Sequence, residues 1–419
     1  MEWGINFTAW PEMLAWPYLI LKGWLPYRDI AVAHNPFLIF ILAIFYKIFG
    51  VGIWQIKIFT WLLISLNVYL VYFVLKKFYD KKVAYLSAII YFLLTIVYEG
   101  NGLWFDLALV PFALLLYLFI REKKYLLAGV IFALGFLTKQ TFVYFAIPIV
   151  IAIVQSTEYK VQRIKQFIFG LATIFLIFAL YLFTNNLISS YYNWAIKFGI
   201  FYLPNAAGQM SLPNLKQLAF AFVPFLVAVL STCLAGRQAE YLVLSFMVVG
   251  MLGVYPRFEL FHFQPALPFL SIVLATFVYS KRNIFLKVIV IVCGVLYTVY
   301  GVGRQLGNTT RFYESDVQRV ATQLTVHGSP SSIYVVNYWD NIYALTNTTP
   351  NKPLIPYIPW YLDYGESKNI ILSNLKSKMP DSVVIGQRDK IFPELYLYVD
   401  KYYSCHKIEK SVELCDKNI

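Results

Sequence analysis

Apolar residues fall into long blocks, separated by short polar breaks, from about residue 53 to about residue 302. The blocks are apolar on all faces, whereas the helices of a soluble protein of this size carry one apolar stripe. Such blocks are typical of helices that cross a hydrocarbon layer of ~30 Å. We therefore predict a polytopic α-helical membrane protein with about ten spans. These cover 53–75, 83–98, 104–120, 125–138, 141–154, 167–184, 218–234, 241–255, 266–280 and 284–302.

Two longer polar segments interrupt or precede these blocks. Residues 1–52 form a first outer loop, which opens on a polar and aromatic run without an apolar segment before it. Within that loop, residues 36–50 are apolar but too short for a full span, so we expect a re-entrant or interfacial helix. The second segment, 185–217, is a loop rich in Tyr and Asn.

Beyond residue 303 the pattern changes to that of a soluble domain. Residues 331–338 and 381–386 have the character of short buried strands, and residues 314–328 and 366–379 that of helices. We therefore divide the chain into a transmembrane domain, 1–302, and a small α/β domain, 303–419. Cys405 and Cys415 in the second domain could form a disulfide in an oxidising compartment, although their spacing alone leaves the pairing open.

The charges give the chain an orientation. Only 14% of residues are charged and 59% are hydrophobic, whereas a soluble protein carries about 25% charged residues. The net charge of +13 could indicate nucleic acid binding, but most basic residues between the spans lie in alternate loops and indicate topology instead. One loop set contains Lys76, Lys77, Lys81, Lys82, Arg121, Lys123, Lys124, Lys160, Arg163, Lys165, Arg237, Lys281, Arg282 and Lys287, and the other contains Lys139, Lys197, Lys216 and Arg257. The first set is therefore cytoplasmic, and the termini and the α/β domain are extracytoplasmic.

Two acidic residues of the first outer loop are candidates for a general base. Glu12 and Asp29 lie in a segment rich in Trp, Tyr and Pro. A carboxylate that aromatic residues shield from water has a raised pKa and can accept a proton from a substrate. The alternatives are that Asp29 is a turn residue and that Glu12 is a solvated loop charge.

A second pair of carboxylates, Glu99 and Asp106, lies in the tight outer turn 98–106, which contains no basic residue. Two carboxylates beside an apolar hairpin are unfavourable unless a cation or a ligand pairs with them. Asp106 could instead cap the helix that follows it.

A group of basic residues is a candidate for phosphate binding. Arg257 and His262 lie in one outer turn and Lys139 in another. A guanidinium with a nearby His and Lys at the headgroup level can hold a phosphate. The alternatives are a lipid headgroup or an ion pair between Arg257 and Glu259.

Several function classes are disfavoured. We find no P-loop, dinucleotide fingerprint, His/Cys metal spacing or nucleophile elbow, which argues against a nucleotide-dependent enzyme. The predicted spans carry almost no charge near their midpoints, which argues against an ion-coupled transporter. The polar residues on the outer side are therefore the main candidates for chemistry.

The motifs resemble those of a known family. They are G-x-x-PYRD (23–29), HNP (34–36), FG (49–50), GFLTKQ (135–140), the YPRF loop (255–268) and IYALTNTTP (342–350). Together they resemble the polytopic GT-C glycosyltransferases, in particular the family 39-like members of bacteria and archaea akin to protein O-mannosyltransferases and the lipid A aminoarabinose transferase. In that family a first transmembrane helix precedes the first outer loop, so we expect this chain to be truncated at its N-terminus or its start codon to be misassigned.

The resemblance implies transfer of a sugar from a polyprenyl-phosphate-linked donor to the hydroxyl of a lipid, glycan or protein, on the outer face of the cell membrane. It implies a base in the first outer loop, which by position is Glu12, where many members have Asp-Glu and this chain has Pro11-Glu12. The remaining expected site residues are Asp29 and Asp106 as catalytic groups, Arg257, Lys139 and His262 on the donor phosphate, and His34 and Glu99 on the substrate. We expect no nucleic acid partner and no required cofactor, although a divalent metal is compatible with the chemistry. The alternative function is a transporter or flippase of lipid-linked glycans.

Overall fold

The computed structural model describes residues 4–155, 159–235, 241–280, 284–326, 330–409 and 411–418. The loop cations Arg237, Lys281 and Arg282 lie outside these residues. The chain divides into two compact units, which are described separately below. Unit 1 comprises Met1–Asn6, Thr60–Thr184 and Met210–Asn308, and unit 2 comprises Phe7–Phe59, Asn185–Gln209 and Thr309–Ile419.

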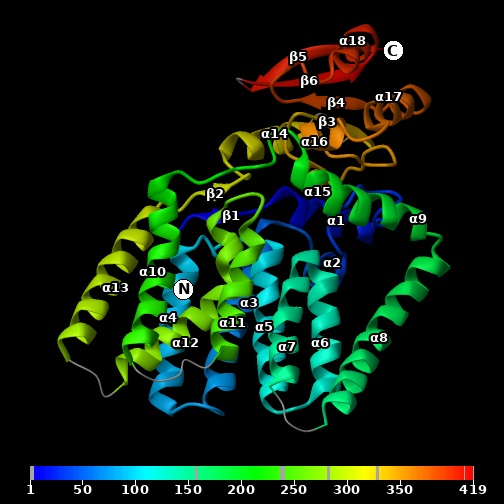
Figure 1. Ribbon diagram of the computed structural model, residues 1–419. Helices are drawn as coiled ribbons and strands as arrows, with labels where there is room; N and C mark the ends of the chain where they lie inside the picture. Colours follow the sequence, from blue (N-terminus) through cyan, green and yellow to red (C-terminus); the bar gives the residue numbers. More distant parts are fainter. Residues whose placement is uncertain are drawn as a thin grey trace. The chain divides into compact units, whose positions relative to one another are not determined.

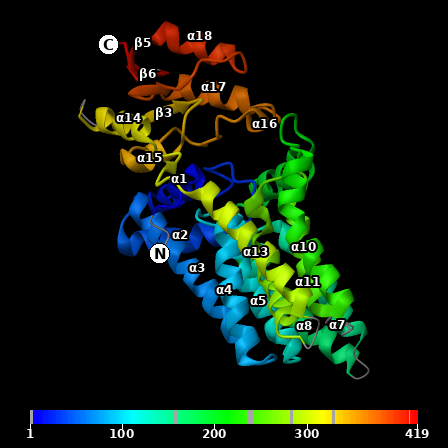
Figure 2. The same cartoon turned by 90° about the vertical axis from the view of Figure 1, so that its left-hand side faces the viewer.

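All of the segments predicted as spans are helical, and in unit 1 the helices run alongside one another (Figure 1, Figure 2). By length and composition, five stretches of the described residues could cross a membrane: Ile53–Leu75, Lys160–Thr184, Leu215–Thr232, Leu260–Val278 and Ile284–Gln305. The helices are α3 (Ile53–Leu75), α4 (Lys81–Val97), α5 (Phe105–Arg121), α6 (Tyr125–Thr138), η1 (Gln140–Phe145), α7 (Ala146–Val154), α8 (Lys160–Thr184), α10 (Leu215–Ala235), α11 (Tyr241–Met251), η4 (Leu252–Val254), η5 (Leu260–Ala266), α12 (Leu267–Val278) and α13 (Ile284–Gln305).

Aromatic rings fill much of the interior of unit 1. The Tyr117 ring lies edge-on to Phe246 and Phe269, with centroids 5.6 and 5.8 Å away, an arrangement that aligns ring edges with ring faces. The hydroxyl of the buried Tyr98 donates a hydrogen bond to the carbonyl of Ala221, 2.6 Å away. Such bonds satisfy the polar ends of aromatic residues that the apolar bundle encloses.

Helices α6 and α8 cross at two glycines. A Cβ on Gly129 would lie 2.1 Å from the carbonyl oxygen of Phe167, and a Cβ on Gly170 would lie 2.1 Å from that of Leu126. Both obstacles are backbone atoms, which cannot move without moving a helix. In a lipid environment, where burial of apolar area gives helices little reason to associate, close backbone contact of this kind holds helices together.

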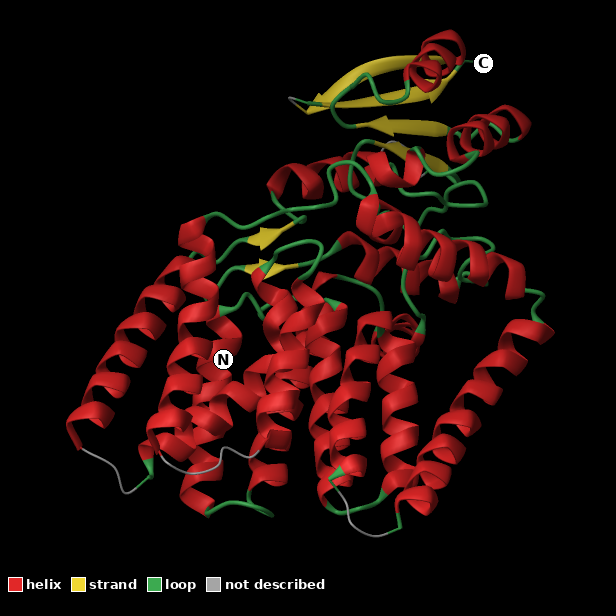
Figure 3. Cartoon of the chain, in the orientation of Figure 1, coloured by secondary structure: helices red, strands yellow, loops and turns green. Residues whose placement is uncertain are grey.

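The strands belong to unit 2 (Figure 3). A four-stranded sheet has the order β3-β4-β6-β5, with β3 (Ile333–Val336) parallel to β4 (Ser382–Ile385), and β6 (Val412–Lys417) antiparallel to both β4 and β5 (Tyr403–Glu409). All residues of β3 and β4 are buried, as is typical of parallel strands inside a sheet. The helices of this segment are α14 (Ser315–Val326), α15 (Asn341–Leu345), α16 (Pro359–Leu362), α17 (Ser367–Ser377) and α18 (Pro393–Tyr402). Strands β3 and β4 and helices α14 and α17 lie within the ranges in which the sequence pattern predicts strands and helices.

The first loop contributes a second part of unit 2. Strand β1 (Phe7–Thr8) pairs in parallel with β2 (Thr310–Arg311), and α1 (Pro11–Leu21) packs against α2 (Phe37–Phe49) and α15. Helix α1 starts at Pro11, a position that suits proline because the first helical N–H has no partner within the helix. The residues between 185 and 209 form α9 (Ile188–Tyr191), the π-helix η2 (Tyr192–Tyr202) and η3 (Leu203–Asn205). The apolar stretch 36–50 is thus helical, and its re-entrant position stays a prediction.

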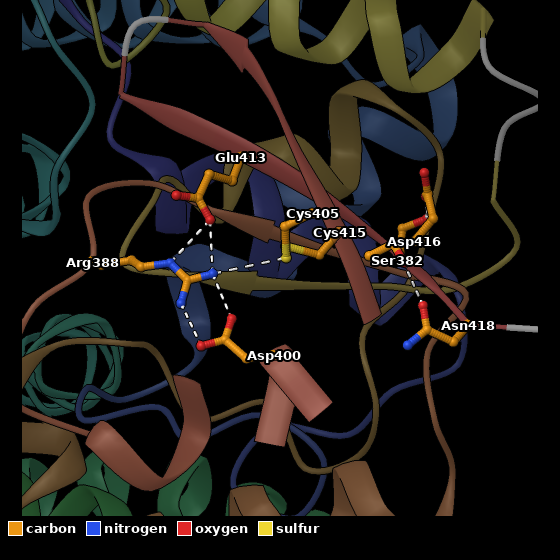
Figure 4. The surroundings of a disulfide bond; sticks show 9 residues. Ser382, Arg388, Asp400, Cys405, Glu413, Cys415, Asp416 and Asn418 are labelled. Carbon is orange, nitrogen blue, oxygen red and sulfur yellow. Dashed lines mark hydrogen bonds and ion pairs between the residues drawn. A yellow bond between two sulfur atoms is a disulfide. The ribbon is translucent and has the colours of Figure 1, made fainter. Parts of the chain in front are cut away.

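The two cysteines of unit 2 are joined. Cys405 and Cys415 face each other on β5 and β6 and form a disulfide (Figure 4). Arg388 lies beside it and donates to Glu413, 3.0 Å away, and to Asp400, also 3.0 Å away (Figure 4). This network ties the β5–β6 hairpin to the segment after β4 and to α18.

The glycine crossing gives a test of the packing of unit 1. Gly129→Ala and Gly170→Ala are expected to lower stability by about 1–3 kcal/mol, because each added methyl group would overlap backbone atoms of the facing helix and push the two helices apart. Gly294→Ala on α13 is the matched control, since a Cβ there meets nothing within 4 Å and alanine favours a helix. Melting temperatures of the detergent-solubilised variants measure the effect, and equal values for Gly129→Ala and Gly294→Ala would contradict it.

Candidate active site

Three of the predicted site residues meet in the interior of unit 1. Asp106 lies in the first turn of α5, Lys139 directly follows α6, and His262 lies in η5. The Lys139 Nζ is 2.9 and 2.6 Å from the two carboxylate oxygens of Asp106. The His262 Nδ1 is 2.8 Å from Asp106 Oδ2. We call these three residues the ion cluster.

Local breaks in the helices place these side chains. Lys139 has an extended backbone, which ends α6. Trp104 before α5 and Glu259 before η5 are extended as well. The negative charge of Asp106 also suits the N-terminus of α5, where backbone N–H groups carry a partial positive charge.

The ion cluster is almost completely buried. Asp106 is 1% exposed, Lys139 5% and His262 8%. A charge in such surroundings is strongly unfavourable unless an opposite charge and hydrogen bonds compensate for it. The two carboxylates of the 98–106 turn were expected to need a cation, and Lys139 supplies one for Asp106. Asp106 also lies in the first turn of α5, which is the position that its alternative role at a helix N-terminus requires.

The hydrogen bonds define the tautomer of His262. At 2.8 Å from a carboxylate oxygen, Nδ1 carries a hydrogen and donates it to Asp106. The Lys139 Nζ is farther from Nδ1, at 3.4 Å, and is directed mainly to the carboxylate. When His262 is neutral, its Nε2 is therefore the nitrogen that can accept a hydrogen bond.

Arg257 and Glu99 lie in turns of unit 1. The Arg257 Nε is 3.3 Å from Glu259 Oε1, and both side chains are partly exposed. The loop of Arg257 is fixed by Ser211, whose carbonyl accepts from the N–H of Phe258 at 3.0 Å. Glu99 follows α4 in a left-handed conformation with a φ of 54°. The ion pair with Glu259, one of the alternatives for Arg257, is thus present.

In unit 2, Glu12 is the second residue of α1 and is partly buried. Its charge acts on two groups of the C-terminal segment, Asp340 and Tyr361. Burial, and after it the charge of Glu12, raise the pKa of Asp340 to about 7. Asp340 follows a strand as a single acidic residue and belongs to no sequence motif.

Asp29 is held on several sides within unit 2. Its carboxylate accepts from the backbone N–H of Leu25 at 2.9 Å, from Arg28 Nε at 3.0 Å and from Lys352 Nζ at 3.1 Å. Burial alone would raise the pKa of Asp29, but hydrogen bonds from Arg28, Leu25 and Lys352 outweigh it and hold the pKa below its usual value. The backbone takes part as well, since the Asp29 carbonyl accepts from the N–H of Leu354 at 2.8 Å.

His34 belongs to a loop that hydroxyl groups fix in place. The Tyr27 hydroxyl donates to the His34 carbonyl at 3.0 Å, and the Tyr191 hydroxyl donates to Asn35 Oδ1 at 2.9 Å. The His34 side chain is half-buried. The HNP motif therefore has a rigid backbone, because two tyrosines from different parts of unit 2 bind it.

Comparisons with known proteins add to this geometry. Residues 33–184 match the model of the dolichyl-phosphate-mannose-protein mannosyltransferase family, a stretch that includes His34, Glu99, Asp106 and Lys139. No curated protein sequence matches the chain.

Two solved structures share the fold along almost the whole chain. The first is ArnT from Cupriavidus metallidurans bound to undecaprenyl phosphate, with a TM-score of 0.68, 11% identity, and coverage of 99% of this chain and 94% of ArnT. The second is the same protein in its apo state, with a TM-score of 0.66, 12% identity, and coverage of 98% and 94%. The chain thus has the fold of ArnT along almost its whole length, and residues 33–184 match the mannosyltransferase family.

Proposed function

We propose that this protein transfers a sugar from a polyprenyl-phosphate-linked donor to an acceptor hydroxyl on the outer face of the membrane. The observation that carries the proposal is the fold, which 99% of the chain shares with an ArnT structure that holds undecaprenyl phosphate. The motif pattern and the family match support it further. The acceptor hydroxyl belongs to a lipid, a glycan or a protein.

Glu12 is the base in this proposal. It takes the proton of the acceptor hydroxyl while the oxygen attacks the anomeric carbon, and the bond from that carbon to the phosphate oxygen breaks. Polyprenyl phosphate leaves with the bonding electrons. Asp29 is less suited to this step, because two cations and a backbone N–H already bind its carboxylate. We assign to Asp29 the role of connecting the first outer loop to the segment around Leu354.

Arg257 stabilises the leaving phosphate in this proposal. Its Nε lies 3.3 Å from Glu259 Oε1, two residues away, and its side chain is 39% exposed, so a phosphate can reach it. Guanidinium groups bind phosphate through two parallel hydrogen bonds. Because polyprenyl phosphate is a good leaving group, the step does not demand a metal.

The ion cluster supports the phosphate site from within unit 1. Asp106 neutralises the charge of Lys139, so the electric field of Lys139 is weak. The Nδ1 of His262 already bonds Asp106, so its Nε2 is the nitrogen that can form a hydrogen bond with another group. We propose that Asp106 is a positioning residue for Lys139 and His262, and that His34 and Glu99 contact hydroxyl groups of the substrate. The outer location follows from the loop charges and extends to the α/β domain.

Replacing the base tests the proposal directly. Glu12→Gln is expected to lower the rate of sugar transfer by about 10²–10⁴, because a positioned base contributes that much. Asp29→Asn is the matched comparison and is expected to lower stability by about 1–3 kcal/mol while the folded fraction keeps its activity. Membranes that contain the full chain are assayed with a panel of radiolabelled polyprenyl-phosphate sugars. No transfer from any donor by the unaltered protein would contradict the proposed function.

The phosphate site predicts a change in donor affinity. Arg257→Gln is expected to raise the KM for the donor at least tenfold, because the charge-assisted hydrogen bonds to the phosphate are lost. Lys216→Gln is the control, since it removes an exposed cation predicted on the same side of the membrane. Steady-state kinetics at varied donor concentration measure both. Equal KM values would refute the assignment of Arg257.

The ion cluster predicts coupled effects on stability. Asp106→Asn and Lys139→Met each leave a buried charge without its partner and are expected to lower stability by about 3–5 kcal/mol. The double variant removes both charges and is expected to recover most of that loss. Melting temperatures of the four proteins in detergent form a double-mutant cycle. Additive losses would show that the two residues act independently.

A further inference from the structure

A groove runs between α3 and α4 within unit 1, with a volume of about 380 Å³. Its lining residues are Trp61, Ile64, Ser65 and Val68 on α3, and Tyr85, Ala88, Ile89, Phe92 and Leu93 on α4. All of them except Ser65 are apolar or aromatic. The groove therefore suits a hydrocarbon chain better than a polar ligand.

Small side chains leave this space open. Ala88 is buried and follows the exposed Tyr85 by three residues, so the two share one face of α4. Ser65 takes a similar position on α3, one turn after Trp61. The Trp61 Nε1 donates to Asn101 Oδ1 at 3.1 Å, a bond that fixes the indole at one end of the groove. An added ring at Ser65 would fill the space.

Lysines continue both walls of the groove at its other end. On α3, Tyr72 and Lys76 extend the row of Val68 at intervals of four residues, and on α4, Lys81 lies four residues before Tyr85. Residues at this spacing share a helix face, so each wall ends in a lysine. The helical turn reaches Lys76, whose N–H donates to the Tyr72 carbonyl at 3.0 Å. The Lys76 ammonium group lies 5.3 Å from the centre of the Tyr72 ring.

The acids at this end compensate for other cations. Glu122 forms ion pairs with Lys77 and Lys124, each at 2.6 Å. The Asp80 carboxylate caps α4 by accepting a hydrogen bond from a backbone N–H. Three exposed lysines have no ion pair with any residue that the structure describes: Lys76, Lys81 and Lys82. This end of the groove therefore carries an excess of positive charge, which favours an anionic group.

We propose that the groove between α3 and α4 holds an acyl chain of an anionic phospholipid, whose phosphate lies on Lys76, Lys81 and Lys82. The acyl chain matches the apolar lining, and lysines at a membrane surface attract anionic headgroups. From Tyr85 to Leu93 the groove is about 12 Å long, and Lys81 lies about 6 Å farther along α4. The total of about 18 Å is close to half of a hydrocarbon layer of ~30 Å, which is one leaflet. The loop charges predict that this leaflet is the cytoplasmic one.

The size of the groove disfavours a protein helix as its occupant. A helix is about 10 Å wide with its side chains, so a stretch of about 12 Å needs roughly 900 Å³, well above the volume of the groove. The groove also contains none of the candidate site residues. Lipid binding can therefore be present or absent whatever the outcome of the sugar-transfer assays.

Lipid binding to the detergent-solubilised full chain tests the inference. Native mass spectrometry compares phosphatidylglycerol with phosphatidylcholine of the same acyl chains. The unaltered protein is expected to retain one phosphatidylglycerol molecule, with an affinity roughly tenfold or more above that for phosphatidylcholine, because the lysines favour a headgroup with net negative charge. The combined variant Lys76→Gln, Lys81→Gln and Lys82→Gln is expected to lose this preference. The matched control changes three other exposed lysines predicted on the same side and is expected to keep it: Lys123→Gln, Lys160→Gln and Lys165→Gln.

Filling the groove is the second part of the test. Ser65→Phe is expected to lower the affinity for phosphatidylglycerol roughly tenfold, because the ring takes the place of buried methylene groups of the acyl chain. Ala172→Phe, which adds a ring at an exposed position of α8, is the control and is expected to bind as the unaltered protein does. Melting temperatures in lipid-free detergent show whether each variant is folded. If Ser65→Phe is unfolded, the substitutions of the exposed lysines decide the question.

Three results would overturn the inference. The first is equal affinity of the unaltered protein for the two lipids, or equal losses in the variants and their controls. The second is displacement of the lipid by water-soluble glycerol phosphate, because the lysines would then bind the headgroup without the groove. The third is a dimer of the chain that Ser65→Phe dissociates, because a second copy would then occupy the groove.

Discussion

The structure of unit 1 depends on the pairing of charge in an apolar bundle. Asp106 and Lys139 are tolerated in the interior only because each compensates for the other, and His262 completes the arrangement. The three side chains come from the ends of three different helical elements, so the pairing fixes where α5, α6 and η5 begin or end. The close glycine contact of α6 and α8 serves the same purpose by different means, since it positions α6 through backbone contact.

Much of the fold can be predicted from the hydrophobic pattern. A segment in lipid must form its backbone hydrogen bonds internally, so it is helical, and its sequence is a long apolar block. The strands Ile333–Val336 and Ser382–Ile385 were equally predictable, as they are short and largely apolar. Helix α1 and the β5–β6 hairpin were not. The α1 segment contains two prolines and three aromatic or acidic residues that match a loop, and β5 is largely exposed, so neither carries an apolar period.

The sequence predicted which residues belong to the site better than it predicted which of them contact one another. Lys139 and His262 were grouped with Arg257 because all three are basic, whereas the structure pairs them with Asp106, since burial favours opposite charges. Asp340 had no signal in the sequence, because it precedes α15, which packs against the distant segment α1 only in the folded chain. Unit 2 combines parts of the three segments that were predicted to lie outside, namely the first loop, the 185–217 loop and the C-terminal segment. Their assembly into one compact body is what a common side of the membrane would allow.

The pairing of β1 with β2 has a consequence for the synthesis of the protein. Phe7 and Thr8 leave the ribosome about 300 residues before their partners, Thr310 and Arg311. The first loop therefore waits without its sheet partner until every helix between them has been made. The surroundings of Glu12 are completed only by the last quarter of the chain, so a nascent or prematurely terminated polypeptide lacks Asp340 and Tyr361. Assembly thus couples the completion of the candidate site to the synthesis of the C-terminal segment.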